Sequence, residues 1–114
     1  MSRTSDQRLA DILERISAIG VAEEHLLGAE AAKNDKLVRT AFDAILYDLL
    51  VIGEAVKALP ADITARHQDI PWSDIAKMRD ILAHIYFNVR SDVIRSTINA
   101  PLAALRDVCG AELT

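Results

Sequence analysis

The sequence of 114 residues has little of several residue types on which whole protein classes depend. Its one cysteine, Cys109, cannot form an internal disulfide and does not by itself provide a zinc site. With no histidine nearby to activate it, Cys109 is expected to be a partly buried, small apolar residue. Four glycines, three prolines and five aromatic residues exclude a disordered or low-complexity chain.

Basic charge and long apolar runs are also scarce. The formal net charge is -4, so any contact with RNA has to come from a local patch and not from a generally basic surface. No apolar run approaches the roughly 20 residues that a membrane span requires. The first sixteen residues are polar and charged, unlike a signal peptide. We therefore expect a cytoplasmic protein that does not insert into a membrane.

What the sequence has is aliphatic residues at helical spacing, beginning with a first helix of about 20 residues. Ser5 is the expected N-cap, followed by Asp6 in the first turn. Gly20 is expected to bend or break this helix. The alanine-rich stretch 28–34 then reads as a connection.

A second, long helix is predicted over 35–59, with Asn34 as its cap. Apolar residues follow one another at three- or four-residue spacing along it, namely Val38, Phe42, Ile45, Leu49, Ile52 and Val56. Leu46 and Leu50 add apolar area on another face, which favours a central helix or an interface. Gly53 inside the helix indicates close approach of another backbone.

Three further helical segments are predicted, each marked by a proline or a cap. Pro60 ends the long helix, and a short helix is expected over 62–68. Pro71 fits the first position of the next helix, whose apolar stripe is Trp72, Ile75, Met78, Leu82 and Ile85. A turn over 88–91 precedes the last helix, which Pro101 should kink. The prediction is a single all-α domain over 1–114, an up-and-down bundle of four to five helices.

Polar groups with chemical potential gather in the segment 77–87. By helical spacing Arg79 and Tyr86 share one face, and Asp80 and His84 share a neighbouring one. An aspartate beside a histidine can hold the ring in one tautomer and favour proton transfer. Spacing alone favours the plainer interpretation, an ordinary solvated helix face.

A resemblance changes this balance. Arg79, four intervening residues, His84, one residue and Tyr86 resemble the R-x4-H-x-Y motif of the HepT-like ribonuclease toxins of the HEPN superfamily. The stretches 52–55 and 70–72 also fit the family, and the likeness covers about 38–105. Two positions depart from its pattern: Asp80 stands where many members carry Asn, and Asn88 where glycine is expected.

The resemblance implies a metal-independent endoribonuclease with no cofactor. Arg79 and His84 would be catalytic, with Asp80 in support, in a cleft between the two subunits of a homodimer. Arg79 and His84 are five positions apart, about 140° around a regular helix, so they converge only if the helix end distorts or a second subunit supplies one of them. We therefore include dimerisation in the hypothesis. Glu54 is expected to form a supporting ion pair, with Arg79 or at a helix end.

The resemblance also implies regulation through Tyr86. A partner nucleotidyltransferase acting as antitoxin would transfer AMP to the phenol, adding bulk and negative charge beside the cleft. The alternative is a binding module without catalysis, which presents Tyr86 or a nucleotide pocket to the nucleotidyltransferase. A purely structural helical dimer is the third interpretation.

Overall fold

The computed structural model describes residues 3–84 and 91–114, and all the regular structure in these two ranges is helical. In chain order the helices are α1 (Ser5–Ala31), α2 (Asp35–Lys57), α3 (Ala61–Arg66), α4 (Trp72–Ala76), α5 (Met78–His84) and α6 (Ser91–Glu112). They form an elongated bundle with extents of 46 × 24 × 23 Å. The predicted all-α bundle is confirmed, with one or two more short helices than expected.

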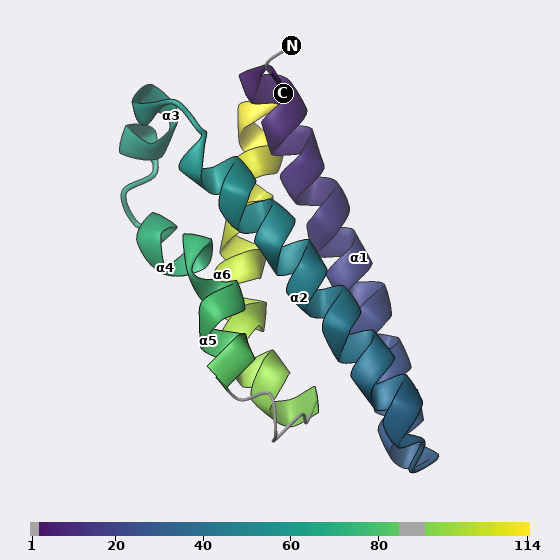
Figure 1. The fold of residues 1–114 in the computed structure, drawn as a ribbon. Coiled ribbons are helices and arrows are strands. Elements are labelled where there is room, and N and C mark those ends of the chain that lie inside the picture. Colours follow the sequence, from purple (N-terminus) through teal and green to yellow (C-terminus); the bar gives the residue numbers. More distant parts are fainter. Residues whose placement is uncertain (1–2, 85–90) are drawn as a thin grey trace.

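The helices α1 and α2 form a long antiparallel hairpin that is the main support of the bundle (Figure 1). Thr4 caps α1, because its hydroxyl accepts a hydrogen bond from the Gln7 backbone at 3.1 Å and the Gln7 side chain returns one. The expected cap at Ser5 was therefore wrong by one residue. Asn34 caps α2 as predicted, by accepting from the backbone N–H of Leu37 at 3.2 Å.

Of the two effects expected of Gly20, a bend or a break, the break is wrong, since α1 continues through Gly20 to Ala31. One glycine costs a helix about 1 kcal/mol. Ile19, Ala22 and Leu26 are all buried around that point, and their packing outweighs this cost. The connection between the two long helices is correspondingly shorter than predicted.

The hydrophobic core is enclosed by the α1–α2 hairpin and the helices that pack on it (Figure 1). The helix α6 packs on α1, and α4 and α5 pack on α2. The apolar stripes predicted for α2 and α6 point into this core. Its fully enclosed members include Phe42, Ile45, Leu49, Ile52, Leu82, Ile94, Ile98 and Leu105. No helix in the described ranges is long and apolar enough to cross a membrane.

Close packing of α2 against α4 explains the glycine inside the long helix. A Cβ atom placed on Gly53 would lie 2.8 Å from the backbone oxygen of Ala76, the last residue of α4. This confirms the predicted approach of another backbone at Gly53. Only glycine allows α4 to pack so closely on α2.

A single helix was predicted to begin at Pro71 and to carry Arg79 and His84. The structure divides it at Lys77 into α4 and α5. The Lys77 N–H bonds to the carbonyl of Asp74 at 3.1 Å, three residues back, so the chain tightens there. Pro71 is the residue before the helix and not its first member. Pro101, in contrast, lies within α6 without interrupting it.

A cluster of charged groups ties α3 to the end of α6. Glu112 accepts from Arg66 at 2.7 and 3.1 Å, and its carboxylate lies 2.6 Å from Nε2 of His67. The hydrogen bonds from Arg66 and then His67 lower the pKa of Glu112 from 4.5 to about 2. One turn earlier on α6 Cys109 is fully buried, and this burial raises the pKa of its thiol to about 11.

Replacing Gly53 with alanine should destabilise the protein by about 1–3 kcal/mol, because the added methyl group would push against the Ala76 carbonyl. Gly20→Ala is the matched control. Nothing lies within 4 Å of a Cβ atom there, so that change should stabilise by about 0.5–1 kcal/mol. Denaturant unfolding of both variants measures the difference. Equal effects of the same sign would contradict the close contact of α2 with α4.

The Glu112 cluster should make stability depend on acid. A carboxyl group whose pKa is lowered by folding stabilises the fold above its unfolded pKa of 4.5, and this contribution is lost as the pH falls from there toward 2. Glu112→Gln should remove that part of the pH dependence. The free energy of unfolding of the variant should therefore fall less than that of the parent as the pH is lowered toward 2. Unfolding curves between pH 6 and pH 2 test it, and parallel pH profiles for parent and variant would refute the role of Glu112.

Candidate active site

The helix α5 presents Arg79 in its first turn, where the side chain is half exposed. Buried Met78 and Leu82 fix the helix against the core, so the direction in which Arg79 leaves the surface is set by packing. The Nη1 atom of Arg79 lies 3.6 Å from Oδ1 of Asp80. Both side chains are open to solvent, and a pair of this kind contributes at most about 1 kcal/mol.

His84 ends α5 and is exposed, on the opposite flank of the helix from Arg79. Among the described residues no hydrogen bond or ion pair joins Asp80 to His84. Asp80 contacts Arg79 instead, because an exposed carboxylate can take the nearer cation. One chain therefore supplies an arginine and a histidine on a single short helix but does not bring them together.

Glu54 and Tyr86 are the other two predicted site residues. Glu54 is exposed on α2 and contacts Lys57 at 3.5 Å, an ion pair along its own helix and not the expected one with Arg79. Tyr86 lies outside the described residues, as do Ile85 and Asn88. The chain is described again from Ser91, whose backbone N–H donates to both carboxylate oxygens of Glu30 on α1, at 3.1 and 3.3 Å.

Exposed apolar side chains accompany the motif. Ile81 is 46% exposed and lies on α5 next to the His84 flank, one turn before His84. Leu50 is 43% exposed on α2, the helix against which α5 packs. In the described ranges no group of three or more His, Cys, Asp and Glu side chains is placed to hold a metal ion.

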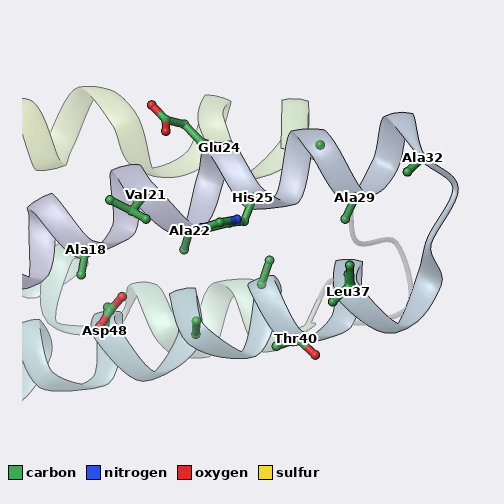
Figure 2. Close-up of a pocket in the computed structure, with 13 residues that line it drawn as sticks. Ala18, Val21, Ala22, Glu24, His25, Ala29, Ala32, Leu37, Thr40 and Asp48 are labelled. Carbon is green, nitrogen blue, oxygen red and sulfur yellow. The ribbon is translucent and has the colours of Figure 1, made fainter.

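A second feature of the surface was not predicted from the sequence. A groove of about 600 Å³ runs between α1 and α2, with Asp48 at one end and Leu37 at the other (Figure 2). Asp48 is buried, and this burial raises the pKa of its carboxyl group although Arg15 donates to it at 3.2 Å. Arg15 also lies over the ring of Tyr47. The feature of the sequence that could have indicated this groove is Asp48, an aspartate on the inward side of an apolar helix.

Comparison with known proteins gives the site its context. The family model described as "Ribonuclease HepT-like" matches residues 7–111. A Thermococcus cleftensis protein named "Probable ribonuclease HepT" is 34% identical over 106 residues, which are 93% of each chain. A Methanocaldococcus jannaschii protein provisionally named an RNase is 36% identical over 86 residues, 75% of this chain and 68% of its own.

A shorter match reaches higher identity. A protein of Caldanaerobacter subterraneus subsp. tengcongensis, also provisionally named an RNase, is 47% identical over 55 residues, about half of either chain. The search of solved structures gave no significant match. The family model spans nearly all of the sequence, and the Thermococcus protein aligns along almost its full length. The chain therefore belongs to the HepT-like ribonuclease family of the HEPN superfamily.

Proposed function

We propose that this chain is a metal-independent endoribonuclease, the toxin of a toxin–antitoxin pair, and that residues 1–114 act as one domain. The observation that carries the proposal is the R-x4-H pattern on α5, with Arg79 and His84 both open to solvent within a chain of this family. The names of the similar proteins support RNA as the substrate.

The residues suit cleavage by the neighbouring 2′-hydroxyl of RNA. A base must take the proton from that hydroxyl, and an acid must donate a proton to the leaving 5′-oxygen. The phosphorane that forms between these steps carries negative charge, which a guanidinium stabilises. We assign the proton transfers to His84 and the phosphate contact to Arg79. Asp80 supports them by holding the Arg79 side chain.

The arrangement on α5 is the reason for including a second subunit. One chain holds a single histidine in the motif, and Arg79 leaves α5 about 140° from it. A two-fold dimer places two of each residue around a shared cleft. The exposed Ile81, one turn before His84 on α5, and Leu50, on the helix against which α5 packs, offer apolar area for such a contact.

Arg79→Ala and His84→Ala should each lower kcat/KM for RNA cleavage by about 100-fold or more. Both residues are exposed, so the variants should keep the melting temperature of the parent. Arg106→Ala, an exposed arginine on α6 next to Asp107, is the charge-matched control and should cleave normally. Cleavage of a fluorescent RNA by purified chains provides the measurement.

Mixing the two inactive variants tests whether the site is shared between chains. Subunit exchange between Arg79→Ala and His84→Ala forms dimers in which one chain supplies the arginine and the other the histidine. Each mixed dimer holds one arginine and one histidine, so it should regain part of the parent's activity, with the one histidine acting first as base and then as acid. Mixtures that remain inactive after verified exchange would contradict a site shared by two subunits.

We further propose that a cognate nucleotidyltransferase silences the toxin by transferring AMP to Tyr86. The step joins the phenol oxygen to the α-phosphate of ATP, with release of pyrophosphate and the phenol proton. The adenylate then competes with RNA phosphate for Arg79. Co-expression with the nucleotidyltransferase should raise the mass of the chain by one or more adenylate groups and relieve growth arrest, and Tyr86→Phe should prevent both. A modified chain that still cleaves RNA fully would refute silencing by this route.

Two observations favour a second function, that of a non-catalytic module that binds a nucleotidyltransferase. The net charge of -4 is unfavourable for RNA binding, and a single chain does not bring Arg79 and His84 together. Growth arrest separates the two functions. The ribonuclease arrests cells and loses this effect on His84→Ala, whereas the binding module does neither.

A further inference from the structure

Two carboxylates on α1 face the helix α6. The two helices pack side by side and run antiparallel, so that both ends of the chain lie at the same end of the bundle (Figure 1). Glu23 and Glu30 are separated by about two helical turns, which places them on one face of α1. Glu30 contacts the backbone of Ser91, whereas Glu23 contacts the side chain of Arg95. The same face of α1 therefore holds α6 in two different ways.

Glu30 caps the start of α6. Both of its carboxylate oxygens accept from the backbone N–H of Ser91, at 3.1 and 3.3 Å. Ser91 is the first residue of α6 and is buried. The first N–H groups of a helix have no partner within the helix, and negative charge is favourable at this end. A side chain 61 positions earlier in the sequence therefore fixes the place at which α6 begins.

Glu23 holds α6 through a side chain alone. Its own side chain is 12% exposed, and Oε2 lies 3.8 Å from Nε of Arg95, about one turn after the start of α6. Burial raises the pKa of Glu23, and the charge of Arg95 acts in the opposite direction. Glu23 thus has the same charge as Glu30 and faces the same helix, but it does not bind the backbone where α6 begins. This makes Glu23 a matched control for Glu30.

The start of α6 is the point to which the chain returns after the motif. His84 is the last residue of α5, and Leu82, two positions before it, is fully buried in a helix that packs on α2. The end of α5 is thus held against α2, and the start of α6 against α1. Residues 85–90, which lie outside the described ranges, join these two points. In so short a connection the positions of the two ends restrict the conformations of the chain between them.

We propose that Glu30 is a positioning residue of the ribonuclease site. By holding the first N–H of α6 it sets the point to which the chain after His84 returns, and so keeps the His84 ring in the orientation that proton transfer requires. Glu30 itself touches neither RNA nor the reacting atoms. Arg79 lies at the other end of α5 and depends less on this contact. The effect on cleavage rests on the proposed ribonuclease function, whereas the orientation of His84 can be measured without RNA.

Steady-state kinetics separate a positioning role from a purely structural one. Glu30→Ala should lower kcat for RNA cleavage about 10-fold and leave KM nearly unchanged, because it disturbs His84 and not the phosphate contact of Arg79. Glu30→Gln keeps an oxygen that can accept from Ser91, so it should regain part of kcat. Glu23→Ala should keep the kcat of the parent. Both alanine variants should lower Tm, because each removes a contact between α1 and α6, so the assays are run well below either Tm.

The ring of His84 provides a readout that needs no RNA. The chain has three histidines, so the NMR signals of their ring protons are few, and a His84→Gln chain identifies the signal of His84. This signal should shift in Glu30→Ala, shift less in Glu30→Gln and stay in place in Glu23→Ala. His67, which contacts Glu112 near the C-terminus, is the internal reference.

A His84 signal that is the same in Glu30→Ala as in the parent, or that shifts equally in Glu23→Ala, would overturn the positioning role. In a parent chain that cleaves RNA, an unchanged kcat of Glu30→Ala would overturn it as well. A parent chain that cleaves no RNA would instead refute the ribonuclease function, and the His84 signal would still decide whether Glu30 orients that ring.

Discussion

The contact between Gly53 and the backbone of Ala76 is the constraint on which the arrangement of the site depends. Because α2 carries no side chain at that point, α4 packs directly on it. The turn at Lys77 follows at once, and α5 begins at the next residue. The direction in which Arg79 and His84 leave the surface is therefore set by the close packing of two helices and the tight turn after them.

Most of the fold could be predicted because the buried residues recur every three or four positions along the helices. The stripes of α2 and α6, the Asn34 cap and the need for glycine at 53 all depend on local spacing or on one backbone group. The failures arose where tertiary packing outweighed a local signal. Buried neighbours carry α1 through Gly20, and the packing of Ala76 on α2 together with the turn at Lys77 divides one expected helix into two.

The residues of the candidate site come from the sequence motif, but the partners of their side chains could not be predicted from it. An exposed charged side chain can pair with any of several neighbours at nearly the same free energy, so the sequence does not determine which pair forms. In the structure Asp80 pairs with Arg79, and Glu54 with Lys57. The groove escaped prediction for another reason. Alanines at helical spacing indicate helix propensity as readily as a contact surface, and only the structure shows which of them line a groove.

These features give a consistent account of a small acidic chain that acts on RNA. In the proposed function a single helix supplies the reactive groups, a second subunit completes the site, and the reaction needs no metal ion. The chemistry of the cut ends tests this most directly. Cleavage of RNA in the presence of EDTA should leave a 2′,3′-cyclic phosphate and a 5′-hydroxyl, and a substrate with a 2′-deoxy nucleotide at the cut should stay intact. Ends with a 5′-phosphate, or activity lost to EDTA and restored by a divalent metal, would contradict the account.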